Sequence, residues 1–476
     1  MRLFRSLLAS AVVGAILFSA FPVCVSAIQT KQKESYHNSE WVQWKGKWYP
    51  TGAVLDSTDA NLATYSVNNV FSKYTYDPYD PSVDLTQETN YFPPIRNQEH
   101  GSCVAFAAVS YQFTYEMAKL NDWNLKAMAN NASELNRHIF SPMYIYNLLH
   151  TYDPPTDYHS GTSIWKAYRL LQQFGAVKEA DFPLLKNNVA NVSEWLQDTE
   201  AQLNALQYRI SDYEILKFAD SSNPTPVDSG VHSPAIQDIK ARLQNEQIVS
   251  IAVRMSGCTA TLPTNGEQAI LFGYNYVDKI TGGHQLTIVG YDDTIEYDIN
   301  KNNVIDPSEK GAFKIANSWG PTWENAGFCW LMYDALNPNS ATNVSYNDMK
   351  SLVRENDPKA PENFEIERFG FISDYTYYCI EVDTYDPVMV AEISFPLSSE
   401  LNTNYTIKPS VNGQTYTNQE PLIKSIPDID NATFYIDLTP FLGESPYKVE
   451  NYIFQLLYRN NNNDTVGQPV YYKLDG

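Results

Sequence analysis

The sequence has few cysteines and few basic residues, and both shortages limit what the protein can be. Its 476 residues include only five cysteines, too few for a disulfide-built scaffold of this length: Cys24, Cys103, Cys258, Cys329 and Cys379. Lysine and arginine number 33 against 55 acidic residues, which gives a formal net charge of -22. Phosphate backbones are bound by basic patches, so the composition argues against a nucleic-acid partner.

Long apolar runs are also scarce, and the one near the start indicates a signal peptide. A basic head precedes apolar residues 7–21, and residues 25–27 (Val-Ser-Ala) offer a small-residue cleavage site. A transmembrane anchor is the weaker interpretation, because the apolar stretch is short and Pro22 ends it. We therefore expect a secreted, extracellular protein after removal of residues 1–27, with no transmembrane segment.

The rest of the chain changes character along its length. Residues 28–77 are polar and aromatic, contain WVQWKGKWYP, and indicate an N-terminal segment or a prosegment. Residues 78–357 begin with helical spacing of apolar residues and pass to short β-type runs from Val249 onward, which predicts an α+β domain. The expected helices cover residues 103–121, 141–150, 163–174, 193–208 and 235–245.

The sequence after residue 357 is of β type only. Runs such as VMVAEISF, ATFYIDL and NYIFQLLYR alternate with loops rich in asparagine, proline and glycine. Residues 358–476 are therefore predicted to form a separate all-β sandwich module of about 110–120 residues, a usual size for such modules. Two roles stay open for it: a stabilising cover for the preceding domain, or contact with a cell surface, a glycan or the substrate.

One cysteine, Cys103, lies where a nucleophile would be useful. The stretch NQEHGSCVAFAAV places it at the start of the first expected helix, after a turn that contains glycine. A thiol attacks only as the thiolate, and its pKa falls at a helix N-terminus and beside a protonated imidazole. A lone cysteine is more often a small core residue, so a catalytic role requires a histidine and a group that orients it.

The second half of the α+β domain supplies both groups. His284 follows two glycines in GGHQLTIVGYDD, where the β-run behind it can hold the ring rigidly. Asn317 ends another β-run in KIANSWGPTW, and its side-chain carbonyl can accept a hydrogen bond from an imidazole. Gln98 lies five residues before Cys103, and its amide could donate to an oxyanion together with the Cys103 backbone N–H. His100 is a nearer candidate base, but it lies in the glycine-containing turn.

These motifs, in this order, resemble the papain-like cysteine peptidases. The resemblance covers about residues 91–335 and includes PPIRNQEHGSCVAFA, SGTS, GAVKEADFP, IKARLQNEQIVSIAV, GGHQLTIVGYDD and FKIANSWGPTWENAGF. It implies a two-lobed fold, with a helical lobe and a β-barrel-like lobe, ahead of the C-terminal module. It also implies an endopeptidase that cleaves proteins or peptides through a thioester acyl-enzyme and needs no organic cofactor.

The resemblance assigns roles to particular residues. Cys103 would be the nucleophile and His284 the acid and base. Asn317 would orient the histidine, and Gln98 would stabilise the oxyanion. The substrate-binding positions that it implies are Gly161, Thr162, Gly283 and Trp319; Thr162 replaces a glycine of the family, and Trp319 would also shield the Asn–His pair.

The chain departs from the family around the nucleophile. The family usually has a cysteine three residues before the nucleophile and an aromatic residue after it, whereas this chain has His100 and Val104. The familiar disulfide is therefore absent, and packing must hold the helical lobe. Residues 28–77 also lack the long helical inhibitory prosegment of better-known members, which leaves the control of activation open.

An insertion between His284 and Asn317 resembles a calcium-binding loop. In DINKNNVIDPSE, residues 298–309, oxygen-bearing side chains fall at positions 1, 3, 5, 9 and 12 of the twelve-residue loop, and position 7 offers a backbone carbonyl. Position 6, usually glycine because the turn needs a positive φ, is Asn303, the next most tolerant residue. A solvated polar loop without a metal is the alternative. We expect a weak, structural Ca2+ site whose ligands are Asp298, Asn300, Asn302, Val304, Asp306 and Glu309.

Two other functions compete with a peptidase. A catalytically silent protein of papain-like fold could serve in binding or adhesion through its C-terminal module, although the intact set of expected catalytic residues disfavours it. An acyltransferase such as a transglutaminase usually pairs its histidine with aspartate, so Asn317 disfavours that function. Labelling of Cys103 by an epoxide or iodoacetamide would separate a peptidase from a silent binding protein.

Overall fold

The structure is a computed structural model, and it describes a large part of the chain. The described residues are 41–53, 64–65, 73–149, 161–186, 189–191, 194–217, 234–255, 264–265, 268–271, 282–298, 303–333, 376–388, 390–396, 404–411, 414–415, 431–437, 439, 452–459 and 470–474. The expected signal peptide, residues 1–27, lies outside them. Among the described helices, none is long and apolar enough to cross a membrane.

The described part of the chain begins with a β-hairpin. Strands β1 (Trp41–Trp44) and β2 (Lys47–Pro50) pair antiparallel around Lys45 and Gly46, which both have positive φ. A two-residue turn with positive φ at both positions matches the twist of hairpin strands, and glycine adopts it readily. Trp44 is buried, so one face of the hairpin packs on the rest of the molecule.

Helices form one part of the main body. The helix expected at Cys103 is a continuous helical run of three segments: α2 (Cys103–Ala105), the π-helix η3 (Phe106–Phe113) and α3 (Thr114–Leu120). The other helices are α1 (Leu85–Glu88), α4 (Leu125–Met128), α5 (Ala132–Asn136), α6 (Pro142–Leu149), α7 (Ile164–Gln173), α8 (Thr199–Ala205) and α9 (Pro234–Gln244). Helix α8 is shorter than expected, because Asp198 caps its start with hydrogen bonds from two backbone N–H groups.

The other part of the main body is a ten-stranded sheet with the order β3-β7-β14-β8-β11-β12-β13-β10-β9, to which β4 adds by pairing with β11. Its strands are β3 (Thr64–Tyr65), β4 (Ser82–Asp84), β7 (Ile210–Lys217), β8 (Val249–Met255), β9 (Thr264–Asn265), β10 (Gln268–Leu271), β11 (Gly282–Glu296), β12 (Lys310–Ala316), β13 (Phe328–Met332) and β14 (Thr376–Val382). The end strands β3 and β9 do not pair with each other in the part of the chain that the structure describes. The sheet is therefore open, and the expected barrel-like lobe is not a closed barrel.

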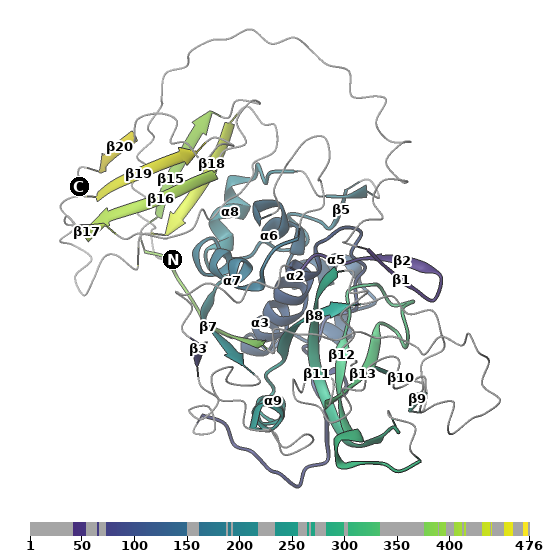
Figure 1. The fold of residues 1–476 in the computed structure, drawn as a ribbon. Coiled ribbons are helices and arrows are strands. Elements are labelled where there is room, and N and C mark those ends of the chain that lie inside the picture. Colours follow the sequence, from purple (N-terminus) through teal and green to yellow (C-terminus); the bar gives the residue numbers. More distant parts are fainter. Residues whose placement is uncertain are drawn as a thin grey trace.

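The helical run that begins at Cys103 lies against this sheet (Figure 1). It packs on β8, β11 and β14, and α6 and α7 cover its other side. The small residues Ala105, Ala107 and Ala108 are buried and permit this close approach from several sides. The expected α+β architecture, with a helical part and a sheet part, is confirmed. A separate short hairpin consists of β5 (Leu185–Lys186) and β6 (Val189–Ala190).

Strand β14 corrects the expected boundary between the domains. It lies inside the main sheet, where Tyr378 pairs with Ile215 of β7 and Tyr377 pairs with Ile251 of β8. Its residues were expected in the C-terminal module, 358–476. Alternating apolar residues predict a strand, but they do not tell which sheet the strand joins, and this is why the boundary was placed too early.

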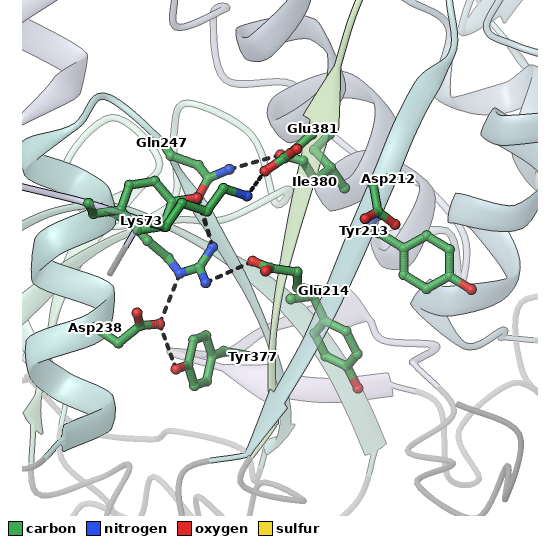
Figure 2. A network of polar contacts seen from close by, with 12 residues as sticks. Lys73, Asp212, Tyr213, Glu214, Asp238, Gln247, Tyr377, Ile380 and Glu381 are labelled. Carbon is green, nitrogen blue, oxygen red and sulfur yellow. Dashed lines mark hydrogen bonds and ion pairs between the residues drawn. The ribbon is translucent and has the colours of Figure 1, made fainter. Parts of the chain in front are cut away.

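A buried polar network holds β14 in the main sheet (Figure 2). Arg242 of α9 donates to Asp238 at 2.9 Å and pairs with Glu214 of β7 at 2.8 Å. The hydroxyl of Tyr377, in β14, donates to the same Asp238 carboxylate at 2.7 Å. Three elements far apart in the sequence therefore share one set of charges, and the buried Arg242 and Asp238 are stabilised by being paired and hydrogen-bonded.

Beyond β14, the described strands form two antiparallel sheets. One pairs β15 (Val390–Pro396) with β18 (Asn431–Asp437), and the other has the order β17 (Gln414–Thr415), β16 (Asn404–Val411), β19 (Tyr452–Arg459) and β20 (Val470–Leu474). They lie together beside α8 at one end of the molecule (Figure 1). Two antiparallel sheets agree with the expected all-β module, and its contact with a cell surface or a glycan stays a prediction.

Candidate active site

Cys103 begins the helical run at the centre of the main body. Ser102 is its N-cap residue, and the run continues unbroken to Leu120. Cys103 is fully buried, and α2 packs against β11, the strand that carries His284. The positive end of the helix dipole lies at this residue.

The other described cysteines differ from Cys103. Cys329 and Cys379 are free thiols that lie inside strands β13 and β14 and are buried. Burial raises the pKa of Cys379 to about 12, and it raises the pKa of Cys329 as well. Both thiols are therefore expected to stay protonated and inert, as small core residues.

His284 and Asn317 meet because their strands are neighbours in the sheet. Strands β11 and β12 pair antiparallel, with Thr287 opposite Ala316. The Nε2 atom of His284 lies 2.8 Å from Asn317 Oδ1, and both side chains are buried. Asn317 Oδ1 also accepts a hydrogen bond from the Ser318 backbone N–H at 2.7 Å, which orients the amide with its oxygen toward the histidine. Nε2 therefore carries the proton, and Nδ1, without a hydrogen-bond partner among the described residues, is the basic nitrogen.

The surroundings of His284 favour the neutral imidazole. Burial lowers the pKa of the ring to about 4, and the hydrogen bond with Asn317 opposes part of this shift. The indole of Trp319 lies beside the ring, with centroids 4.8 Å apart and planes tilted by 30°. Trp319 thus lies where the resemblance places an indole that shields the Asn–His pair.

Gln98 is oriented by Ser318. The backbone N–H of Gln98 donates to the Ser318 carbonyl at 2.7 Å, and the Ser318 hydroxyl donates to Gln98 Oε1. With its oxygen engaged in this way, the Gln98 amide presents Nε2 as a donor, which bonds to the carbonyls of Pro50 and His100 at 3.2 and 2.8 Å. The contact of Ser318 with Gln98 was not predicted from the sequence, where its only signal is its place after Asn317.

Tyr111 is a second contact that the sequence did not reveal. It is buried in the π-helical segment η3, and its hydroxyl donates to the Asn317 backbone carbonyl at 3.0 Å. The same oxygen accepts a hydrogen bond from the Arg96 backbone N–H at 3.3 Å. One hydroxyl thus connects the helix of Cys103 to the end of the Asn317 strand and to the segment that leads to Gln98.

The N-terminal part of the chain covers the site. The buried Pro50, at the end of β2, accepts hydrogen bonds at its carbonyl from Gln98 Nε2 and from Trp319 Nε1, the latter at 2.8 Å. Residues 41–53, which comprise the hairpin and the three residues after it, are called the covering segment below. The amide that the resemblance assigns to the oxyanion therefore holds a carbonyl of the same chain.

The covering segment also contacts the residues expected to bind substrate backbone. The N–H groups of Gly52 and Ala53 donate to the Gly283 carbonyl at 2.8 and 2.9 Å. The N–H of Thr162 donates to the Gly52 carbonyl at 2.9 Å. The structure thus brings Thr162, Gly283 and Trp319 together around one extended stretch of main chain.

Glycine permits this close approach on both sides. A Cβ atom on Gly161 would lie 1.8 Å from the Gly52 carbonyl oxygen. A Cβ atom on Gly52 would lie 2.2 Å from the Gly101 carbonyl oxygen. Real Cβ contacts are never that short, so a side chain at either position would push the covering segment away.

The expected calcium loop is described in part. Asn303 has a φ of 64°, the left-handed conformation that position 6 of the loop requires. Its N–H donates to Asp298 Oδ2 at 2.8 Å, which closes the loop between positions 1 and 6. The expected ligands Asn300 and Asn302 lie outside the described residues.

The end of the loop forms a capped turn. Asp306 is the N-cap of the 3₁₀-helix η5 (Pro307–Glu309), and its N–H donates to Glu309 Oε2 at 3.0 Å. Glu309 is fully buried, whereas Val304, whose carbonyl was expected to be a ligand, is 57% exposed. Among the described residues, no group of three His, Cys, Asp or Glu side chains is placed to hold a metal ion.

A family model supports the identification made from the motifs. Residues 159–347 match the model of the papain family cysteine proteases. The matched stretch contains Thr162, His284 and Asn317, and it begins after Gln98 and Cys103. No curated protein matches the chain.

Solved structures similar to the chain have low sequence identity and low TM-scores. Xylellain, a cysteine protease from Xylella fastidiosa, is 18% identical over 72% of this chain and 98% of its own length, with a TM-score of 0.41. Procathepsin B S9 from Trypanosoma congolense is 13% identical over 59% and 80%, with a TM-score of 0.39. The proform of the ragweed pollen allergen Amb a 11, a cysteine protease, is 16% identical over 66% and 68%, with a TM-score of 0.35.

Proposed function

We propose that this chain, a papain-family cysteine protease by its sequence, is a secreted endopeptidase that works through Cys103, His284 and Asn317. The observation that carries the proposal is the 2.8 Å contact between His284 Nε2 and Asn317 Oδ1, beside the helix that begins at Cys103. This contact keeps the proton on Nε2 and leaves Nδ1 as a base. Secretion would follow from the expected signal peptide, residues 1–27.

The reaction would proceed in two steps. Cys103 gives its proton to His284 Nδ1, and the thiolate attacks the peptide carbonyl while Gln98 Nε2 and the Cys103 N–H stabilise the oxyanion. His284 then protonates the leaving amine, and a thioester acyl-enzyme remains. In the second step, water attacks the thioester with His284 as the base, which releases the acid and restores the thiol.

The covering segment would inhibit this reaction until it is displaced. The Pro50 carbonyl uses the Gln98 donor that a substrate oxyanion would need, and the Gly52 carbonyl uses the Thr162 N–H. Substrate and covering segment cannot use these donors at the same time. Of the two expectations for residues 28–77, an unassigned N-terminal segment or a prosegment, these contacts favour the prosegment.

The test of the proposed function is hydrolysis of casein and of a fluorogenic peptide under reducing conditions. We expect Cys103→Ala to lower kcat/KM by at least about 1000-fold, as loss of a nucleophile usually does. Cys329→Ala, which removes another buried thiol, is the matched control and should keep the activity. Full activity in Cys103→Ala would contradict the proposal. No activity and no epoxide labelling of Cys103 in the unmodified protein would favour a catalytically silent binding protein.

The loop at 298–309 is proposed separately to bind Ca2+. Support comes from Asn303, whose left-handed conformation and bond to Asp298 match the turn of a calcium loop. Bound Ca2+ would stiffen the connection between β11 and β12. We expect chelation by EGTA to lower the Tm of the unmodified protein by a few degrees, which corresponds to a loss on the order of 1 kcal/mol in the free energy of unfolding. Chelation should leave the Tm of Asp298→Ala unchanged. An unchanged Tm and unchanged activity after chelation would overturn the proposal.

A further inference from the structure

The covering segment fills a pocket beside the catalytic centre with one indole. The ring of Trp44 lies against Trp319 and Trp323, with centroid distances of 5.9 and 5.6 Å. All three indoles are buried. Trp319 and Trp323 also contact each other edge to face at 5.6 Å, and this packing belongs to the main body. The two walls of the pocket therefore do not depend on Trp44.

Glu324 forms the polar end of this pocket and binds two neighbouring residues of the hairpin. Its Oε1 accepts a hydrogen bond from Trp44 Nε1 at 2.6 Å, and its Oε2 pairs with Lys45 Nζ at 2.8 Å. The Glu324 side chain is only 7% exposed. A carboxylate this far from water is stabilised by such donors, and its desolvation is costly without them.

The backbone around Glu324 is held in an unusual conformation. Glu324 has a φ of 40° and Ala326 a φ of 53°, a left-handed region that residues with side chains rarely adopt. The turn is closed within the main body, where the Gly327 N–H donates to the Trp323 carbonyl at 2.8 Å. Such strain is concentrated at binding sites, where the surrounding structure imposes it. The main body closes this turn by itself, so we expect the backbone of Glu324 to keep its place after the hairpin has left.

The pocket and Thr162 contact different parts of the covering segment. The covering segment crosses the centre at Pro50, where Gln98 holds its carbonyl, and reaches Thr162 two residues later, at Gly52. Trp44 precedes Pro50 in the chain, and its ring lies against Trp319, whose Nε1 donates to the Pro50 carbonyl. A substrate that replaces the covering segment would therefore pass the pocket with a part of its chain that does not contact Thr162.

We propose that Trp319, Trp323 and Glu324 form a substrate subsite that takes a tryptophan side chain with a lysine or arginine beside it. The inference rests on the proposed peptidase function and adds a substrate class to it. Once the hairpin is displaced, the subsite consists of two indole walls and a carboxylate without the donors it now holds. Ring packing then contributes affinity, and the charge-assisted bond to the carboxylate selects the cation.

The test compares quenched fluorescent peptides cleaved by the enzyme after removal of the covering segment. The peptides share one sequence except at two adjacent positions, on the side of the scissile bond that does not contact Thr162, which are Trp-Lys, Lys-Trp, Trp-Glu or Ala-Ala. Of Trp-Lys and Lys-Trp, we expect the better substrate to have a kcat/KM about tenfold above those of Trp-Glu and Ala-Ala. One charge-assisted hydrogen bond provides a factor of about this size. Equal kcat/KM for all four peptides would overturn the subsite.

Variants of Glu324 connect the preference to its carboxylate. Glu324→Lys should reverse the order of Trp-Lys and Trp-Glu, and Glu324→Gln, the gentler change, should remove the preference for lysine. Glu194→Lys, which reverses an exposed carboxylate paired with Lys186, is the matched control and should leave every ratio unchanged. An unchanged Trp-Lys to Trp-Glu ratio in both Glu324 variants would contradict the proposal.

Failure of this inference is distinguishable from failure of the peptidase function. If only the subsite is wrong, the unmodified enzyme cleaves all peptides alike and Cys103→Ala cleaves none. If the peptidase function is wrong, the unmodified protein and Cys103→Ala behave alike, even with Ala-Ala.

Discussion

Tyr111 acts on the candidate site through the backbone of Asn317. Its hydroxyl donates to the Asn317 carbonyl at 3.0 Å, and this bond joins the helix of Cys103 to the strand end that orients His284. Tyr111→Phe removes both hydrogen bonds of the hydroxyl, the one donated to the Asn317 carbonyl and the one accepted from the Arg96 N–H. Loss of the bond to Asn317, about 1–2 kcal/mol, corresponds to about 5–30-fold. We expect this loss in kcat with little change in KM, because substrate contacts stay intact. Steady-state kinetics on a fluorogenic peptide measure the split.

Tyr115→Phe is the matched control for Tyr111→Phe. Tyr115 is also a buried tyrosine on the same helical run, one turn further along. Both variants remove a hydroxyl from the core, but only the hydroxyl of Tyr111 bonds to Asn317. The acidic limb of the pH profile should therefore shift in Tyr111→Phe alone. Equal losses of kcat in both variants would show a general effect on packing instead.

The sequence could indicate that His284 and Asn317 would be in contact, but not which neighbouring residues hold them in position. His284 and Asn317 were expected to be partners from their residue types and order, and they lie in contact. Tyr111 and Glu324 had no such signal, because tyrosine and glutamate have many possible partners. The donor that Glu324 binds, Trp44, is 280 residues away in the sequence, and only the fold brings them together.

At the scale of elements, the covering segment depends on a glycine that touches the site. A Cβ atom on Gly52 would lie 2.2 Å from the Gly101 carbonyl oxygen. Gly52→Val should therefore displace the segment without changing any residue of the catalytic machinery. We expect the activity of the unprocessed chain to rise at least about tenfold, which needs only about 1.4 kcal/mol of lost affinity. Initial rates before any processing measure it.

A second glycine of the same hairpin provides the control. Gly46 has a φ of 79° in the hairpin turn, and a Cβ there would meet no atom within 4 Å. Gly46→Asn keeps a residue that tolerates this conformation, so the hairpin and the inhibition should both persist. If Gly52→Val were no more active than Gly46→Asn before processing, residues 41–53 would not be inhibitory.

Burial of His284 makes the stability of the folded chain sensitive to acid. Burial lowers the pKa of the ring to about 4, whereas the ordinary value is 6.5. Between these two values the folded chain binds fewer protons than the unfolded chain, so lowering the pH destabilises the fold, by up to about 1.4 kcal/mol per pH unit. Thermal denaturation of the inactive Cys103→Ala chain, with and without His284→Gln, measures this contribution. We expect the Tm to fall more steeply below pH 6 in the chain that keeps His284, and equal falls in both chains would contradict it.

The elements show where sequence patterns reach their limit. Alternation in WVQWKGKWYP indicates strands, and the lysine–glycine pair suits a tight turn, yet the pattern does not name the surface that the hairpin covers. That surface consists of Trp319 and of the backbone at Thr162 and Gly283, which come from three distant segments. Local pattern predicts an element, whereas its place depends on contacts that are not local.

At the scale of the whole molecule, the C-terminal part is joined to the main body by more than a linker. Strand β14 lies between β7 and β8 in the main sheet. In addition, Arg209, which directly precedes β7, pairs with Asp437 of β18 at 2.9 Å. The hydroxyl of Tyr385 donates to the same carboxylate, and the Arg209 guanidinium lies over the Tyr385 ring. The change to all-β sequence after residue 357 therefore does not mark where one folded unit ends.

Two shortened chains test where the main body ends. A chain that ends at residue 357 lacks β14, so the edges of β7 and β8 are exposed and Asp238 loses the hydroxyl of Tyr377. Gln112 and Gln247 lose the carbonyls of β14 to which they donate, both at 2.9 Å. Loss of partners in a buried charged network costs on the order of 3–5 kcal/mol, a large part of the 5–15 kcal/mol that usually stabilises a domain.

A chain that ends at residue 388 is the matched comparison, because it keeps β14 and loses only the strands beyond it. Arg209, which is buried in the full chain, then lacks Asp437 but keeps the ring of Tyr385. Removal of the strands beyond β14 returns its guanidinium to water, so the loss should be about 1 kcal/mol. We expect the longer chain to unfold cooperatively and to cleave peptides after processing, and the shorter one to melt far lower or to aggregate. Thermal denaturation measures the stability of each chain, and peptide hydrolysis measures its activity. Equal stability of the two chains would return the boundary to residue 357 and make β14 dispensable for the main sheet.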